Sequence, residues 1–195
     1  MSYLTYYYKY GSKPFCSLTD LDDTVATQLM KELYVENSLL WERFSNPKQY
    51  MDARRYTEKW LLDEFIKRGG RPLSKTPLYF VFGESIWFNT NENTENKSLA
   101  CQIQIPLEIF DEMEISFTYP DSMLTLLLAY QKDPNYYLPE YHGKLFTLKE
   151  INEIINTKGI PCKDWNTILH QKMPNYIEAQ VWNKEKVMEY YKKIN

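Results

Sequence analysis

The stretch "PNYIEAQVWNKEKV", residues 174–187, decides how the C-terminal part of this chain folds. Read with a period of two, it places apolar side chains on one face, namely Ile177, Ala179 and Val181. The opposite face then holds a carboxylate and an amide between two aromatic rings: Tyr176, Glu178, Gln180 and Trp182. A half-buried strand normally turns solvated residues away from its apolar face. Two interpretations stay open: a partly exposed strand, or a strand whose polar face forms the floor of a site.

The length and charge of the chain limit its class. With 195 residues it is long enough for a single domain with its own core, and we expect a helical subregion at about residues 19–70. The net charge is −3 without any basic block, so strong binding to duplex DNA is not expected. No apolar run has the length of a membrane span and no secretory signal opens the chain, which predicts a cytoplasmic protein without a membrane partner. The aromatic content of 17 Tyr, 9 Phe and 5 Trp suits pockets and interfaces as well as a packed core.

Residues with special chemistry are sparse. The three cysteines, Cys16, Cys101 and Cys162, have neither a pairing motif nor a metal-ligand spacing, which favours free thiols in a reducing compartment. The two histidines, His142 and His170, lie far apart in the sequence, so no metal site is expected. With six glycines and no glycine-rich phosphate loop or nucleophile elbow, the common nucleotide-binding and hydrolase motifs are missing.

Helix signals are clearest in the N-terminal half. Asp20 is the predicted N-cap of a helix that reaches about residue 34. Asn46 followed by proline is typical of a helix start, and the helix of residues 47–68 is predicted to end at a Gly-Gly pair. Within it, charged side chains at helical spacing favour surface ion pairs: Arg54, Arg55 and Glu58.

The remaining elements alternate between strands and helices without βαβ regularity. Strands are predicted at residues 3–10, 78–82, 86–88, 99–106, 115–119 and 176–182, with a polar loop at 89–98. Further helices are predicted with Asp121 or Ser122 as N-cap, after Thr147 and from near Asn183, with a short helical stretch at 165–170. This mixed order favours an α+β fold in which peripheral helices cover a mixed, mainly antiparallel sheet.

Two polar interruptions of apolar segments are candidate site elements. In "FGESIW", Gly83 permits an unusual backbone angle, and Glu84 and Ser85 lie between apolar residues; a β-bulge is the simpler interpretation. In "FTYPDSM", Asp121 and Ser122 lie where a strand gives way to a helix start, whose N–H groups favour a bound anion. A plain helix cap is the simpler interpretation there.

The order of these pieces resembles the ADP-ribosyltransferase fold, and most of all the nucleic-acid-modifying toxin branch called DarT. An aromatic first strand and a helical region are followed by "PLYFVFGESIWF", which is similar to the proline-led strand that carries an NAD-contacting arginine in that branch. "FTYPDSM" lies where the branch has a strand and a polar turn, and "IEAQVW" is similar to the strand that holds its catalytic glutamate. The resemblance implies a bacterial enzyme that uses NAD as a substrate.

The resemblance also implies roles for individual residues. Glu178 would stabilise the positive charge that develops on the ribose when the nicotinamide bond breaks, and Gln180 would orient the acceptor. Tyr6 or Tyr7 would contact the nicotinamide, and Ser85 would position the ribose.

A pyrophosphate contact is still needed, because Gly83-Glu84 stand where the branch has its arginine. The resemblance leaves this role to Arg54 or Arg55. Asp121, in the polar turn, is a further candidate for cofactor binding.

Two other functions remain open from the sequence. A non-catalytic binding or accessory protein with an aromatic-rich surface would suit phage or toxin–antitoxin biology. A hydrolase or nuclease would use Asp121, Glu178 and His142. For the transferase itself the acceptor, protein or nucleic acid, is not identified by any motif.

Overall fold

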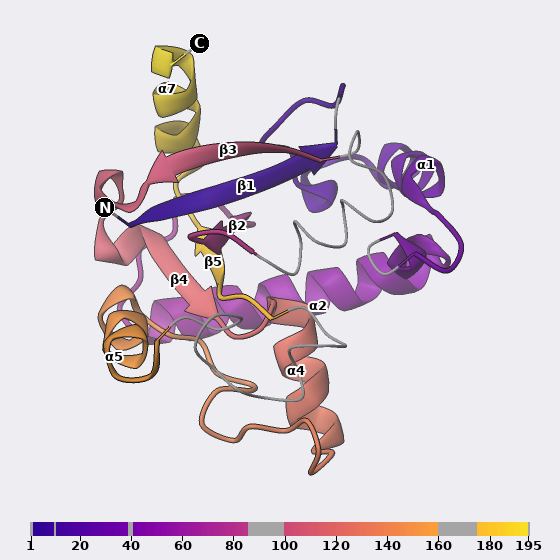
Figure 1. Cartoon of the computed structure of the whole chain (residues 1–195). Helices are drawn as coiled ribbons and strands as arrows, with labels where there is room; N and C mark the ends of the chain where they lie inside the picture. The colour runs from indigo at the N-terminus through magenta and orange to yellow at the C-terminus, as the bar shows by residue number, and fades with distance from the viewer. Residues whose placement is uncertain (1, 10, 39–40, 86–99, 160–174, 195) are drawn as a thin grey trace.

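A five-stranded sheet forms the centre of the computed structural model of this chain, which describes residues 2–9, 11–38, 41–85, 100–159 and 175–194 (Figure 1). The strand order is β3-β1-β2-β5-β4, and each neighbouring pair is antiparallel. The strands are β1 (Tyr3–Lys9), β2 (Leu78–Phe82), β3 (Ala100–Pro106), β4 (Ile115–Thr118) and β5 (Glu178–Val181).

Helices surround this sheet in the described part of the chain. They are α1 (Asp23–Leu33), α2 (Pro47–Lys67), α4 (Ser122–Gln131), α5 (Leu148–Lys158) and α7 (Lys184–Ile194). Short 3-10 turns join them: η1 (Leu18–Asp20), η2 (Glu42–Phe44), η3 (Leu107–Ile109) and η4 (Glu112–Glu114). The predicted α+β class with a mainly antiparallel sheet and peripheral helices is therefore confirmed.

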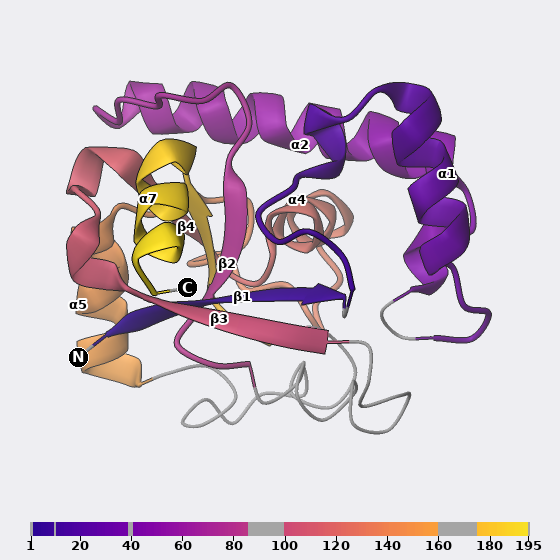
Figure 2. The ribbon, with the colours of Figure 1, turned by 90° about the horizontal axis from the view of Figure 1, so that it is seen from above.

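Strand β5 has the two faces that its alternation predicts. Ile177, just before the strand, and Ala179 and Val181 within it belong to the main core, where side chains of α5 and α7 join them. On the other face Trp182 is fully buried, and its ring stacks on Phe65 of α2 with the centroids 5.4 Å apart. Helix α2 thus covers the face that carries Glu178, and this face is not a solvated surface (Figure 2).

The helix boundaries follow local capping chemistry, with one correction. Asn46 accepts a hydrogen bond from the Gln49 N–H at 3.1 Å and begins α2, as predicted. The prediction that Asp20 caps the first helix is wrong, because Asp22 accepts from the Thr24 N–H instead. Asp20 ends the η1 turn.

Three predicted elements lie outside the described residues, namely the short strand at 86–88, the loop at 89–98 and the helical stretch at 165–170. Cys162 and His170 lie there too, whereas Cys16 and Cys101 are free thiols. In the ranges that the structure does describe, none of the helices combines the length and the apolar character needed to cross a membrane.

Candidate functional site

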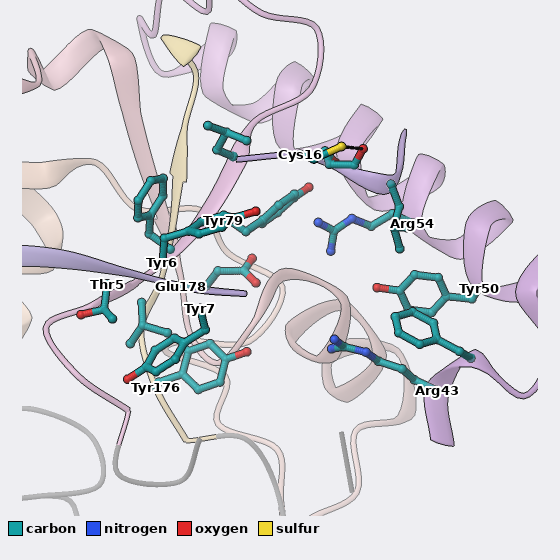
Figure 3. Close-up of a pocket in the computed structure, with 16 residues that line it drawn as sticks. Thr5, Tyr6, Tyr7, Cys16, Arg43, Tyr50, Arg54, Tyr79, Tyr176 and Glu178 are labelled. Carbon is teal, nitrogen blue, oxygen red and sulfur yellow. Dashed lines mark hydrogen bonds between the residues drawn. The ribbon is translucent and has the colours of Figure 1, made fainter. Parts of the chain in front are cut away.

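A cavity of about 220 Å³ lies between the sheet and the helical region of residues 17–54 (Figure 3). Strands β1, β2 and β5 form one wall, and the turns η1 and η2 and helix α2 form the other. Six of its lining residues carry the chemistry considered below: Tyr7, Arg43, Tyr50, Arg54, Tyr176 and Glu178. With Tyr6 and Tyr79, which also line it, the cavity joins a carboxyl group, two guanidinium groups and five phenols.

Glu178 is the carboxyl group of this cavity. The residue is only 6% exposed, and Figure 3 shows its carboxylate opposite the guanidinium groups of Arg43 and Arg54. Two donors fix the Oε1 atom: the Ser122 N–H at 3.0 Å, at the start of α4, and the Gln180 amide at 3.1 Å. These contacts hold the carboxyl in one orientation, as a catalytic group requires.

The surroundings of Glu178 bring its ionisation close to neutral pH. Burial raises the pKa of Glu178 to about 7, and the neighbouring carboxyl of Asp121 acts in the same direction. The positive charge of Arg54 and the hydrogen bonds from Ser122 and Gln180 oppose this rise. Burial also raises the pKa of Asp121. Near neutral pH both forms of Glu178 are populated, which is the behaviour expected of a functional carboxyl group.

Gln180 lies outside the cavity lining and holds Glu178 by a hydrogen bond. It is fully buried, and its carbonyl oxygen accepts a hydrogen bond from Ser116 Oγ at 2.9 Å. Its amide donates to Thr118 Oγ1 at 3.0 Å as well as to Glu178. Gln180 is not among the residues that line the cavity, so the structure places it as a support for Glu178 rather than beside an acceptor.

Arg54 enters the cavity from α2. Its Nε donates to Glu58 at 3.1 Å, and its guanidinium lies 3.6 Å from the centre of the Tyr79 ring. The predicted surface ion pair is wrong for this residue, because the side chains of Arg54 and Glu58 are only 15% and 5% exposed. Arg55 faces another way and pairs with Asp23 of α1. Of the two arginines proposed from the sequence, the structure brings Arg54 into the cavity.

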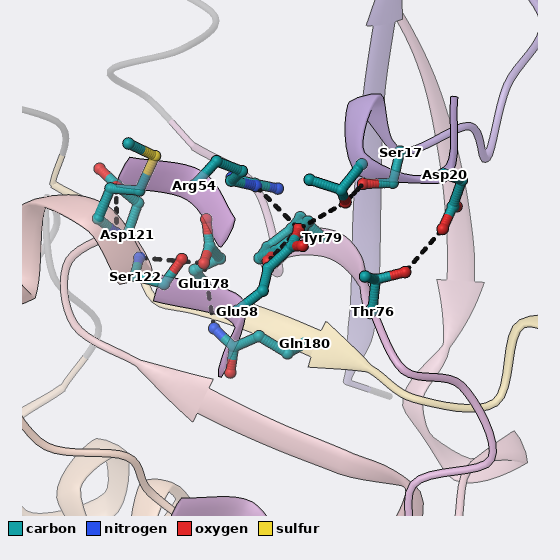
Figure 4. A network of polar contacts seen from close by, with 12 residues as sticks. Ser17, Asp20, Arg54, Glu58, Thr76, Tyr79, Asp121, Ser122, Glu178 and Gln180 are labelled. Atoms are coloured by element: carbon teal, nitrogen blue, oxygen red, sulfur yellow. Dashed lines mark hydrogen bonds and ion pairs between the residues drawn. The ribbon is translucent and has the colours of Figure 1, made fainter. Parts of the chain in front are cut away.

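Glu58 organises the wall behind Arg54 (Figure 4). One of its oxygens, Oε1, accepts from Arg54, from the Tyr79 hydroxyl at 3.1 Å and from Thr19 Oγ1 at 2.9 Å. The side chain is buried, so these donors replace the water that a carboxylate otherwise needs. The network ties η1, α2 and β2 together around the cavity.

Two cavity residues, Arg43 and Tyr50, were not identified from the sequence. Arg43 lies in η2, and its guanidinium packs 5.0 Å from the Phe44 ring centre. Tyr50 lies one turn before Arg54 on α2, so the Asn46 cap would have placed the two on one face. No signal in the sequence places Arg43 there, because its position depends on how η2 packs.

Tyr6 and Tyr7 of β1, the two residues that the resemblance assigns to the nicotinamide, both line the cavity. Tyr6 packs between Phe15 and Phe80, with ring centres 4.7 Å and 5.3 Å away, and burial raises its pKa to about 12. The Tyr7 hydroxyl accepts a hydrogen bond from the Ser85 N–H at 3.3 Å. Ser85 is fully buried behind Tyr7 and does not line the cavity.

The two polar interruptions occupy different places. Asp121 caps α4, accepting from the N–H groups of Met123 and Leu124 at 3.1 and 3.0 Å, and lies next to the cavity without lining it. Gly83 has a positive φ of 69° and turns the chain after β2. Glu84 is exposed and accepts hydrogen bonds from Tyr3 and Gln104, away from the cavity lining.

His142 belongs to a separate cluster. It is buried, its ring stacks 6.1 Å from the ring of Tyr119, and burial lowers its pKa to about 4. It does not line the cavity that holds Glu178. No group of three or more His, Cys, Asp or Glu among the described residues is arranged to hold a metal ion.

The chain matches no protein-family model, and neither the curated proteins nor the solved structures yield a match to it.

Proposed function

We propose that this protein is an NAD-dependent ADP-ribosyltransferase-like enzyme that modifies a macromolecular acceptor. The observation that carries this proposal is the position of Glu178: a buried carboxyl on a central strand, held by two hydrogen bonds and facing a cavity lined by tyrosines and arginines. This arrangement supports the roles that the resemblance assigns to Glu178, to the first-strand tyrosines and to Arg54.

The proposed reaction breaks the bond between nicotinamide and ribose. The electron pair of that bond leaves with nicotinamide, and positive charge develops on the ribose. The carboxylate of Glu178 would stabilise this charge, and a buried carboxylate does so more strongly than one in water. A nucleophilic atom of the acceptor then forms the new bond to the ribose carbon and loses its proton. The Ser122 N–H and the Gln180 amide would keep the carboxylate aimed during both steps.

The aromatic lining supports binding of the planar rings of NAD. Tyr7, Tyr50 and Tyr176 each present a phenol ring at the cavity. Phenol rings stack on flat heterocycles and add hydrogen bonds through their hydroxyls. This lining favours an aromatic ligand over an aliphatic one of the same size.

The test combines binding with cleavage. Millimolar NAD is expected to raise the melting temperature of the wild-type chain. Nicotinamide is expected to appear slowly in the solution, because water takes the place of the acceptor and forms the new bond to the ribose carbon. Glu178→Gln keeps the size of the side chain and should retain the thermal shift while cleaving NAD about 100-fold more slowly. The control, Glu150→Gln, changes a carboxyl that bonds Arg68 and Thr147 outside the cavity lining, so NAD should raise its melting temperature by the same amount as that of the wild type and should be cleaved at the wild-type rate.

Three outcomes would contradict the proposal. The first is a melting temperature that does not change at millimolar NAD. The second is cleavage that Glu178→Gln leaves unchanged. The third, a thermal shift without any nicotinamide release from the wild type, would favour the non-catalytic binding protein.

A further inference from the structure

A chain of buried hydrogen bonds leads from Trp182 to the carboxyl of Glu178. The Trp182 indole N–H donates to Ser116 Oγ at 3.0 Å, and Ser116 Oγ donates to the Gln180 carbonyl oxygen at 2.9 Å. The Gln180 amide then donates to Glu178 Oε1 at 3.1 Å (Figure 4) and to Thr118 Oγ1 at 3.0 Å. The residues that lead to Glu178 are fully buried, so these bonds replace the water that their polar groups would otherwise bind.

The chemistry of the side chains fixes the direction of this hydrogen-bond chain. An indole N–H only donates, so Ser116 Oγ accepts from Trp182 and has one proton of its own to give. Gln180 Oε1 accepts that proton, and the amide therefore turns its N–H groups toward Glu178 and Thr118. The reverse orientation of the amide would leave the Ser116 proton without an acceptor and would bring two oxygens together at Glu178. The chain thus keeps a hydrogen-bond donor at Glu178.

The first residue of the chain is itself held by packing. The ring of Trp182 stacks on the ring of Phe65, with an angle of 14° between their planes, and both residues are at most 1% exposed. Phe65 belongs to α2, the helix that also carries Arg54 into the cavity. Because a tightly packed ring keeps one rotamer, the indole N–H stays directed at Ser116. The packing of α2 is thereby linked to the orientation of Gln180.

We propose that Trp182 and Ser116 are positioning residues for Glu178: they fix the amide of Gln180 and, through it, the carboxyl that lines the cavity. Among the described residues both donors to this carboxyl, the Gln180 amide and the Ser122 N–H, bind Oε1. Oε2 is then the oxygen that is left to a ligand and to the proton of the acid form. A role of the chain in NAD cleavage rests on the proposed function, whereas its hold on Glu178 does not.

Other ionisable groups also act on Glu178, and the test has to separate them from the hydrogen-bond chain. They are Asp121 before α4, Arg54 from α2 with its partner Glu58, Arg43 from η2, Tyr79 of β2 and Tyr176 before β5. None of them belongs to the chain, and the substitutions in Trp182, Ser116 and Gln180 keep all of them. A changed pKa of Glu178 in these variants therefore reports the loss of the chain.

The experiment follows Glu178 itself, by NMR titration of the full chain with isotope-labelled glutamate over about pH 5 to 9. The signal of Glu178 is the one that is missing from Glu178→Gln. Gln180→Leu removes the donor and should lower the acid dissociation constant of Glu178 about tenfold, because a hydrogen bond to the carboxylate favours the charged form.

Two substitutions test the positioning residues. Ser116→Ala leaves the Gln180 amide without the partner that sets its direction, and should lower the acid dissociation constant of Glu178 about threefold. Trp182→Phe keeps a ring against Phe65 and frees the Ser116 hydroxyl to rotate, which should lower this constant about twofold. If the wild type cleaves NAD, the pH at which cleavage reaches half its maximal rate should rise in both variants.

The matched control is Tyr119→Phe, which also removes a buried hydroxyl. Tyr119 follows β4 directly and belongs to the main core, on the other face of the sheet from Gln180. Its hydroxyl donates to Asn175, so its loss also costs stability. The pKa of Glu178 should nevertheless stay at its wild-type value of about 7. A general loosening of the fold would change the titration of Glu178 in this control as well.

Two results would overturn the proposal. One is a pKa of Glu178 that Ser116→Ala or Trp182→Phe leaves unchanged, and the other is an equal change in Tyr119→Phe. If Ser116→Ala does not fold, Trp182→Phe decides alone, because it keeps the stacked ring. Failure of the transferase looks different. If the variants change the pKa of Glu178 but the wild type never cleaves NAD, the positioning chain stands and the proposed enzyme falls. If NAD is cleaved through Glu178 while the variants leave its pKa unchanged, the reverse holds.

Discussion

At the residue scale, the burial of Glu178 links its chemistry to the stability of the fold. Its ordinary pKa of 4.5 rises to about 7 in the folded chain, mainly because burial disfavours the charged form. Between these values the folded state holds a proton that the unfolded state releases. The resulting stabilisation is fully present below pH 4.5 and is lost as the pH rises through about 7.

Replacing Glu178 by Gln should therefore change how stability depends on pH. The variant cannot ionise, so its melting temperature should fall less than that of the wild type between pH 5 and about 8. Thermal melts in a buffer series measure the difference. Glu150→Gln supplies the opposite control, because hydrogen bonds that Thr147 donates to Glu150 and the charge of Arg68 lower the pKa of Glu150 despite its partial burial. That variant should have a lower melting temperature than the wild type at neutral pH, and the difference should shrink as the pH falls below 4.5. Parallel curves for Glu178→Gln and the wild type would contradict this account.

At the element scale, α2 carries one buried ion pair and one exposed ion pair. The turn that holds Arg54 and Glu58 faces the cavity, whereas the Lys59–Asp63 pair faces solvent with side chains 75% and 59% exposed. The two pairs have the same spacing along the helix. Their different burial predicts very different contributions to stability.

Glu58→Gln should destabilise the chain by about 3 kcal/mol, because it leaves the largely buried charge of Arg54 without its partner. Asp63→Asn removes the same charge from the exposed pair and should cost less than about 1 kcal/mol. Urea unfolding followed by circular dichroism measures both free energies. Equal effects of the two substitutions would show that the burial of the Arg54 pair has no energetic consequence.

The same helix shows what could and could not be predicted from the sequence. Its bounds depend on Asn46 and the Gly-Gly pair, which act on their neighbours, so local chemistry was enough to predict them. The two faces of β5 follow from alternation alone. What covers the face of Glu178 depends on the contact of Trp182 with Phe65, which joins segments far apart in the chain. Arg43 was missed for the same reason.

The wrong prediction of Asp20, instead of Asp22, as the N-cap of α1 has a similar origin. Both aspartates are good N-cap residues, and the local pattern does not separate them. In the structure the Asp20 carboxylate accepts hydrogen bonds from Thr76 Oγ1 at 2.7 Å and from Lys184 Nζ at 2.6 Å. A distant lysine, not the local sequence, therefore determines which aspartate begins α1.

At the scale of the whole molecule, Lys184 connects the two ends of the chain. It is the first residue of α7, and through Asp20 it holds the η1 turn, whose residue Leu18 lines the cavity. The ion pair is partly exposed, with 23% for Lys184 and 36% for Asp20. A partly exposed pair contributes little to global stability, yet it can limit local opening where it ties two segments together.

Lys184→Met keeps the apolar stem and removes the charge, so it should lower the free energy of unfolding by less than about 1 kcal/mol. Amide hydrogen exchange should nevertheless become faster in η1 and at the start of α1, because these segments lose their tie to α7. Lys186→Met is the matched control. Lys186 lies on the same helix but pairs with Glu114 at 2.6 Å, so its loss should speed exchange in η4 and leave η1 unchanged. Exchange measured by mass spectrometry separates these patterns. If both variants speed exchange in η1 equally, or neither does, Lys184 does not hold the cavity wall in place.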